Sequence, residues 1–274
     1  MRRGIGIVAM GLGVAALVAA AWSLTGGGRS FHLGGSWFAP VRFVSVTRRV
    51  QLRPGATITI DAQAAHVSVR TGRPGVMDVG YTLPRGTFRL TAGPGQVTVS
   101  DQVRNLNFGL FAPSLFMRIT VPAGSVVTVT SAAGPVTITG LYSRLSVAAL
   151  AGTVTVRGTV TGQIRLTDAA GPISADFAAA ASRASIADAA GSIILDGPWA
   201  RVESVHAEAG SVTMKGGPAV RTAVSVTVAA GQLQSSMAGL PSGGNGTFSG
   251  TVGRRGAGGS LTILATAGSV TLRP

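Results

Sequence analysis

The sequence predicts an all-β protein, a parallel β-solenoid (β-helix) with rungs of about 19 residues, preceded by one N-terminal transmembrane helix. Three observations support this prediction. One short phrase recurs through residues 125–274, the residues around it alternate between apolar and polar, and an uncharged apolar stretch follows the first three residues. An antiparallel β-sandwich is the alternative, because strand-turn-strand units also describe hairpins.

The recurring phrase is a small-residue–glycine corner followed by an alternating strand, as in residues 132–138 (AAGPVTI). Its glycines lie 18, 19, 20, 19, 21 and 37 residues apart, at Gly134, Gly152, Gly171, Gly191, Gly210, Gly231 and Gly268. A second alternating strand precedes each corner. Strands this short bury an apolar face only when equivalent copies stack, about 4.8 Å apart. A sandwich has no reason to repeat one corner phrase, so the stacked arrangement is favoured, with glycine at a corner of positive φ.

One polar column tests the stacking. Five residues after the corner glycine, consecutive copies carry Arg157, Asp176, Asp196 and Lys215. In a stack this column has opposite charges at both ends and a like-charged pair in the middle, and cross-strand pairs of opposite charge are stabilising. We interpret it as a register device on a solvated face.

The N-terminal segment 1–25 is predicted to be a membrane anchor or a signal segment. Residues 4–24 carry no charge, which is enough length to span a bilayer, and Arg2 and Arg3 would remain in the cytoplasm. The C-terminal domain would then be extracytoplasmic, on a single-pass protein of the cell membrane. A protein secreted after signal cleavage is the alternative, because residues 19–21 (AAA) offer a cleavage site.

Three further regions follow. Residues 26–52 form a glycine-rich spacer and an aromatic N-terminal cap, and residues 53–124 form irregular β rungs with an apolar loop at 105–116. Regular repeats occupy 125–274, interrupted by one degenerate rung in a mobile loop between Gln234 and Ser260. The apolar loop either folds onto the flank of the rungs or offers a patch to a partner. The patch residues would be Phe108, Leu110, Phe111 and Phe116.

The start of the regular repeats resembles a known family. Residues 121–124 (VPAG) are followed by Val-Thr-Val, a small-residue–glycine corner and rungs of about 19 residues. This pattern is similar to the bacterial putative-adhesin family, a β-strand-repeat domain of unknown function, over Arg53 to Pro274. The resemblance implies a location in the cell envelope and a β-solenoid, and it supplies no catalytic residues.

No catalytic site stands out, and we expect a non-enzymatic protein without a cofactor. The chain has no cysteine, its three histidines lack metal-ligand spacing, and no phosphate-binding loop is present. Asp168 and Asp188 each stand three residues before a corner glycine, so they should stack on neighbouring rungs. Such a pair could serve a carbohydrate-active β-helix enzyme or bind calcium. The favoured interpretation is that each carboxylate accepts hydrogen bonds from the backbone of its own turn.

Charge is the remaining functional clue. The chain has 23 Lys and Arg against 9 Asp and Glu, a net charge of +14. For an exported domain the anionic neighbours are wall polymers and membrane surfaces, and no nucleic acid is expected because basic residues do not interleave with aromatic ones. We therefore expect a basic surface that binds anionic cell-wall polymer, the membrane surface or a protein partner. An arginine-rich surface without a ligand is the alternative, and so is a purely structural or envelope-stress sensing domain.

Overall fold

The computed structural model describes residues 43–53, 55–84, 87–93, 95–101, 115–218, 221–253 and 258–274, all within the compact unit Val41–Pro274. The regular elements in these ranges are all strands, and they pair into one hydrogen-bonded sheet. None of the described elements is a helix that could cross a membrane. The predicted anchor at 1–25 and residues 26–42 of the predicted spacer and cap lie outside the described residues.

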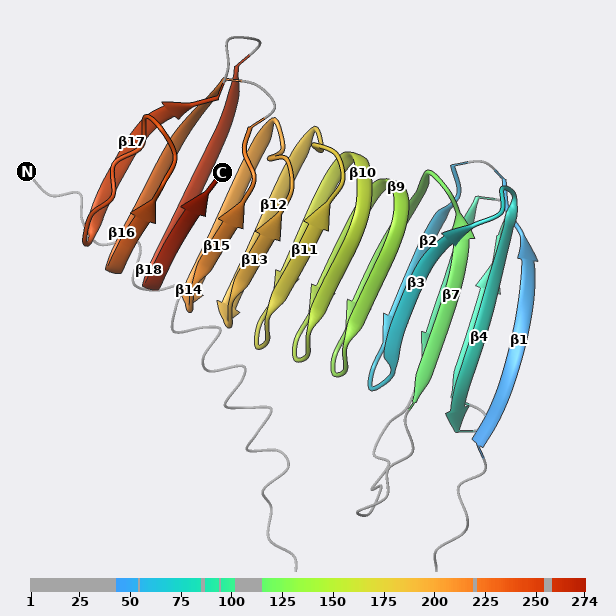
Figure 1. Cartoon of the computed structure of the whole chain (residues 1–274). Coiled ribbons are helices and arrows are strands. Elements are labelled where there is room, and N and C mark those ends of the chain that lie inside the picture. The colour runs from blue at the N-terminus through green and yellow to red at the C-terminus, as the bar shows by residue number, and fades with distance from the viewer. Residues whose placement is uncertain are drawn as a thin grey trace, which may run out of the picture. The chain divides into compact units, whose positions relative to one another are not determined.

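The described strands are numbered along the chain (Figure 1). They are β1 (Phe43–Gln51), β2 (Thr57–Ala62), β3 (His66–Gly72), β4 (Val76–Pro84), β5 (Phe88–Ala92), β6 (Gln96–Asp101), β7 (Phe116–Pro122), β8 (Ser125–Ser131), β9 (Val136–Ala149), β10 (Val154–Asp168), β11 (Ile173–Phe177), β12 (Arg183–Ala190), β13 (Ile193–Asp196), β14 (Val202–Ala209), β15 (Val212–Lys215), β16 (Thr222–Ser235), β17 (Gly246–Val252) and β18 (Gly259–Arg273).

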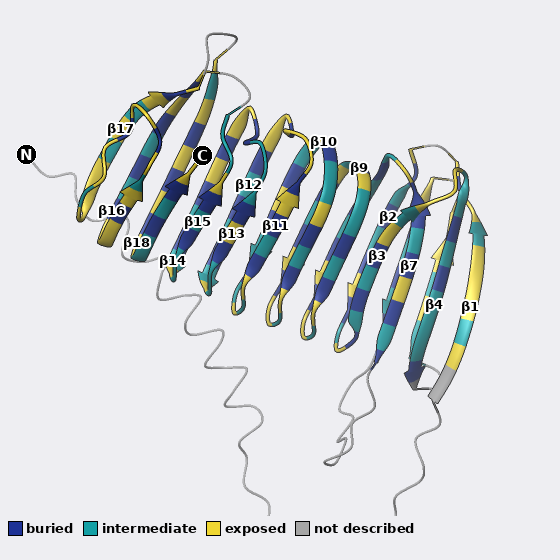
Figure 2. Cartoon of the chain, in the orientation of Figure 1, coloured by how far each residue is buried: buried dark blue, intermediate teal, exposed yellow. Residues whose placement is uncertain are grey.

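The register predicted from the repeat is confirmed. Equivalent positions of successive copies pair in parallel, so that one apolar column runs through Val136, Val154, Ile173, Ile193, Val212, Val270 and Leu233. Every residue of this column is buried. Bands of buried and more exposed residues alternate along the strands in Figure 2, as a period of two requires. The charge column is also stacked, with Asp196 beside Lys215 and a separation of 3.8 Å between Lys215 Nζ and Asp196 Oδ1.

The corner glycines are required for two reasons. Six of the seven have φ between 108° and 147°, a region that side chains disfavour, and Gly191 is the exception. A Cβ atom added at Gly171 would overlap the carbonyl oxygen of Gly152 in the neighbouring copy. The corners therefore stack backbone against backbone, which confirms the predicted positive φ and explains why small residues precede each glycine.

The fold class itself was predicted wrongly. The described strands do not form a β-solenoid but close into a parallel β-barrel of seven strands with further strands outside it, through the pairing order β10-β11-β13-β15-β18-β14-β12 and back to β10. The reason lies in β10 and β18. Each of these strands continues without a break through two segments that are separate strands in the copies between them. β10 therefore pairs with both β11 and β12, and β18 pairs with both β15 and β14, which links the two rows of shorter strands into one closed ring. The antiparallel sandwich is also wrong, because these pairings are parallel.

Spatial order departs from chain order at both ends of the array. The last copy, on β18, pairs with β14 and β15, while β16 lies on its other side and carries β17 antiparallel to it. The expected degenerate rung is therefore an edge strand, β17. At the other end, β2 lies between β6 and β8, and β3 lies between β7 and β9.

Antiparallel strands complete the N-terminal end. β4 pairs with β7 and with β1, so the strands run in the order β1-β4-β7-β3-β9 (Figure 1). Residues 43–51 of the predicted cap thus form the outer strand of this group. The inner face of the group carries buried side chains such as Met77, Val79, Met117 and Ile119. Its outer face is polar and hollowed.

Candidate functional site

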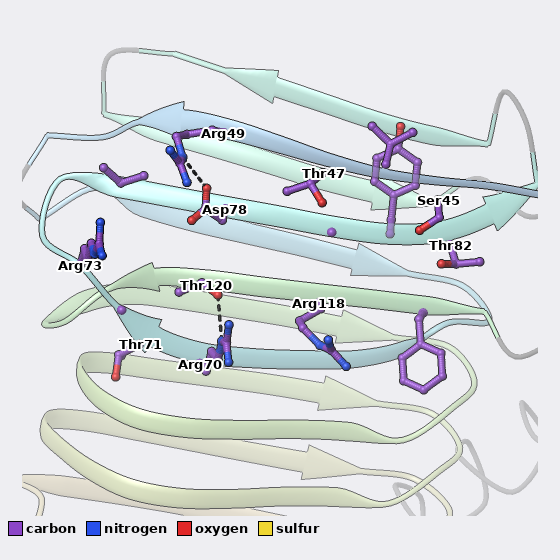
Figure 3. A pocket seen from close by; sticks show the side chains of 16 residues that line it. Ser45, Thr47, Arg49, Arg70, Thr71, Arg73, Asp78, Thr82, Arg118 and Thr120 are labelled. Atoms are coloured by element: carbon purple, nitrogen blue, oxygen red, sulfur yellow. Dashed lines mark hydrogen bonds and ion pairs between the residues drawn. The ribbon is translucent and has the colours of Figure 1, made fainter.

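A groove of about 920 Å³ lies on the outer face of β1, β4, β7 and β3 (Figure 3). Strand pairing places the outward side chains of these four strands in three rows that cross the strands, and the groove lies over most of them. The first row is Ser45, Thr82, Phe116 and His66, the second is Thr47, Gly80, Arg118 and Ser68, and the third is Arg49, Asp78, Thr120 and Arg70. Successive rows are two residues apart along each strand, which is about 7 Å. The groove is therefore an open trough about 14 Å from the first row to the third.

Arginines dominate the groove. Arg49, Arg70, Arg73 and Arg118 line it together with one carboxylate, that of Asp78. Figure 3 shows Arg49, Arg70 and Arg73 toward one end and Arg118 near the middle. The lining residues therefore carry an excess of positive charge, and a trough bounded by protein focuses that charge on an approaching anion.

Two of the arginines are held by neighbours. Arg49 Nε donates to Asp78 Oδ1 at 2.8 Å, and this hydrogen bond, followed by the charge of Asp78, raises the pKa of Arg49. The Arg49–Asp78 pair is exposed, so it contributes little to stability and mainly sets the position of both side chains. Arg70 Nε donates to Thr120 Oγ1 at 3.0 Å, which leaves the two terminal nitrogens of Arg70 available. For Arg118, no hydrogen bond or ion pair with another described residue is present.

Gly80 forms the floor of the groove. It lies between Thr47 on β1 and Arg118 on β7, where an outward side chain would otherwise fill the trough. A Cβ atom added there would come no closer than 3.8 Å to its neighbours. The backbone does not need glycine at this position, so the effect of the missing side chain is to leave the groove open.

Phe116 lies at the first-row end of the groove, in contact with His66. The rings of His66 and Phe116 lie 4.8 Å apart, tilted by 38°. Phe116 is half-buried, so part of its ring faces the groove. Of the four residues predicted as a partner patch, Phe116 is the one that the structure places, and it belongs to this groove. Phe108, Leu110 and Phe111 lie outside the described residues.

Asp168 and Asp188 are in register on β10 and β12, as their spacing predicts. Their side chains point into the protein and are 5% and 3% exposed. Asp168 Oδ1 accepts from the Ala170 backbone N–H and Asp188 Oδ1 from that of Ala190, each at 3.2 Å. The favoured turn role is therefore confirmed, and neither carboxylate faces a cleft where a polysaccharide could reach it.

The second oxygen of each carboxylate accepts no hydrogen bond from the described residues. Oδ2 of Asp168 and Oδ2 of Asp188 are buried and have no hydrogen-bond partner among the described residues. Burial, and secondarily the charge of Asp168, raises the pKa of Asp188 to about 6. Burial also raises the pKa of Asp168, against the hydrogen bonds from Ala170 and Ala169. Within the described ranges, no group of three or more His, Asp or Glu side chains could hold a metal ion.

A third buried carboxyl interrupts an apolar column. Glu203 stands between Ala184 and Leu261 on the neighbouring strands and is 5% exposed. Its Oε2 accepts from the Ala200 N–H at 3.0 Å, while burial raises the pKa of Glu203 to about 7. Its role is to hold the turn before β14.

Sequence patterns do not single out the groove arginines. Arg70 and Thr120 are 50 residues apart and become neighbours only because β3 pairs with β7. The sequence signal that could have found them is an arginine at an outward position of an alternating strand segment. Many other arginines of this chain occupy such positions, so the signal is not specific.

Comparisons with known proteins add the following. No family model and no curated protein matches the chain. Among solved structures, it is similar to a putative cell adhesion protein from Clostridium sporogenes (9% identity, 84% of this chain and 99% of the other, TM-score 0.40). It is also similar to a putative adhesin from Bacteroides fragilis (14%, 84% and 96%, TM-score 0.44) and a putative lipid binding protein from Parabacteroides distasonis (11%, 83% and 96%, TM-score 0.40). Two of these names agree with the putative-adhesin resemblance of the sequence, and at TM-scores below 0.5 we draw nothing further from them.

Proposed function

We propose that this chain is a non-enzymatic, adhesin-like protein of the cell envelope that binds an anionic polymer or surface through its basic outer face. The observation that supports this most directly is the groove on β1, β4, β7 and β3, which gathers four arginines around one carboxylate. Guanidinium groups keep their charge at any physiological pH and form forked hydrogen bonds to phosphate and carboxylate oxygens.

The envelope location rests on the N-terminal sequence. Residues 4–24 are uncharged and follow Arg2 and Arg3, the arrangement of an anchor that leaves the domain outside the cytoplasm. Outside the membrane, the abundant polyanions are wall polymers and lipid headgroups, which are the partners that a basic trough would meet.

The carbohydrate-active alternative loses its candidate residues. Asp168 and Asp188 are buried, and each uses one oxygen to hold its own turn. A general acid or nucleophile must reach the substrate, and these side chains point away from solvent. Binding without turnover is therefore the function that we propose.

Retention on immobilised polymers tests the proposal. The full chain, kept in a mild non-ionic detergent, is passed over poly(glycerol phosphate), polygalacturonate and neutral dextran at about 0.02 M and about 0.5 M NaCl. We expect retention on at least one polyanion at low salt, release at high salt and no retention on dextran. Retention that does not depend on salt, or equal retention on dextran, would refute binding through the basic face.

A further inference from the structure

We propose that the groove on β1, β4, β7 and β3 is a binding site for one sugar-phosphate or polyol-phosphate unit of an anionic wall polymer. This inference rests on the proposed function and specifies its ligand. The phosphate lies among Arg70, Arg118 and Thr120, and the sugar or polyol extends along the groove toward Phe116.

The phosphate end has donors that converge from two strands. Thr120 Oγ1 accepts from Arg70 Nε at 3.0 Å, so the hydroxyl hydrogen of Thr120 remains free to donate to an anion. The same hydrogen bond fixes Arg70 with its terminal nitrogens free, and Arg118 lies one row away on β7. Donors arriving from different directions suit a tetrahedral phosphate. A planar carboxylate is satisfied by one guanidinium fork in a single plane.

Asp78 limits where the anion lies. Its carboxylate is held by Arg49 and stands in the same row as Thr120, on the β4 side. An anion near Asp78 would be repelled, so the favourable position is displaced toward Arg70 and Arg118. Arg49 is partly neutralised by the same carboxylate and therefore adds less to binding.

The opposite end suits a sugar or polyol. Ser45 and Thr82 offer hydroxyl groups that donate and accept, and Phe116 offers part of an aromatic ring. Phe116 lies two residues before Arg118 on β7, about 7 Å along the strand. That separation is comparable to one sugar-phosphate unit, so both ends of the unit can be held at once.

Gly80 leaves the room that such a unit needs. It is the middle residue of the floor, and a small added side chain meets no clash there. Val46, Val76, Tyr81 and Phe116 give the groove some apolar lining. The middle of its floor, however, carries Thr47, Gly80 and Arg118, which offer no apolar surface to an acyl chain. These features favour a soluble polymer over the interior of a lipid layer.

Competitive elution identifies the ligand class. The full chain is loaded on immobilised poly(glycerol phosphate) at low salt and eluted with glucose 1-phosphate, inorganic phosphate, glucuronate or glucose, all at equal ionic strength. We expect glucose 1-phosphate to elute the chain at a concentration at least fivefold lower than the other three. Equal elution by glucuronate would refute phosphate selectivity, and equal elution by inorganic phosphate would refute the sugar subsite. Retention on vesicles containing phosphatidylglycerol, without retention on the polymer, would refute the polymer assignment.

Two variants locate the site. Gly80→Leu fills the trough without changing charge, and Arg118→Gln replaces one charged guanidinium with a neutral amide. Each should weaken binding at least fivefold. Arg165→Gln, an exposed arginine on β10, removes the same charge elsewhere and should bind as the native chain does. If Gly80→Leu does not fold, the comparison of Arg118→Gln with Arg165→Gln still shows whether binding takes place in the groove. If retention is salt-sensitive but neither groove variant changes it, the groove is refuted as the binding site and the proposed function stands. If the native chain is retained on none of the polyanions, both proposals are refuted.

Discussion

Replacing Asp188 with asparagine should stabilise the folded chain at neutral pH. The native carboxyl is 3% exposed, is stacked on Asp168, and has an Oδ2 atom without a hydrogen-bond partner in the described structure. Burial, and then the charge of Asp168, raises the pKa of Asp188 to about 6 from 3.8. The amide introduced by Asp188→Asn would carry no charge, and its oxygen could still accept from the Ala190 N–H.

The pKa shift sets both the size and the pH window of the effect. A rise of about two pKa units corresponds to about 3 kcal/mol. Because the turn lies at the surface, with Ala190 exposed, solvent screening reduces the expected gain to roughly 1–2 kcal/mol. The folded carboxyl binds its proton more tightly than the unfolded one, so the contribution of Asp188 to stability is fully present below about pH 4 and is lost as pH rises through about 6. Asp188→Asn removes this decline.

Urea unfolding of the native and Asp188→Asn chains at intervals from pH 4 to pH 8 measures the effect. We expect no difference in unfolding free energy at pH 4 and the full gain at pH 8. Glu203 titrates in the same window, but its contribution is common to both chains and cancels in the difference. Asp168→Asn is the matched control: it should lower the pKa of Asp188, so the two substitutions together should stabilise by less than their sum. A difference that is the same at pH 4 and pH 8, or a variant less stable at pH 8, would refute this reasoning.

Three other predictions follow from the same structure. Gly171→Ala should destabilise the fold by several kcal/mol or prevent folding, because the added Cβ overlaps a backbone carbonyl at positive φ. Gly55→Ala, at φ 76° with open space around it, should cost only about 1 kcal/mol. Thermal unfolding of both variants separates the cost of steric overlap from the cost of the backbone conformation. Glu203→Gln should raise stability at pH 8 by up to about 3 kcal/mol and leave it unchanged at pH 4, since the amide keeps the Ala200 hydrogen bond without a buried charge; stability independent of pH in the native chain would contradict this. Tyr142→Phe should cost about 1 kcal/mol in urea unfolding, because the buried hydroxyl donates to the Thr139 carbonyl oxygen at 2.9 Å, and an unchanged midpoint would show that this hydrogen bond contributes nothing.

Part of the fold could be predicted because it is local and repeated. Apolar residues two and four positions after the corner glycine, with Ser235 the one polar exception, specify a strand with one buried face, and the self-similar copies specify their register. The corner conformation followed from glycine itself. The turn role of Asp168 and Asp188 followed from their place beside a tight corner, and the hydrogen bonds to Ala170 and Ala190 confirm it.

Closure and spatial order could not be predicted in this way. All copies present the same apolar columns, so the sequence does not distinguish pairing of β18 with β16 alone from its insertion between β16 and β14. Nor does it show that β10 and β18 continue unbroken, which closes the barrel and made the solenoid prediction wrong.

The sequence by itself determined strands, register, corners and an excess of positive charge, because each depends on residues within one repeat or on composition alone. Only the tertiary structure decided the barrel closure and the groove. Arg49, Arg70 and Arg118 come from three separate strands. Antiparallel pairing of β1, β4 and β7 and parallel pairing of β7 with β3 bring them to one face. The physical reason is that a period of two specifies which face a side chain lies on, while the strands that share that face are set by long-range pairing.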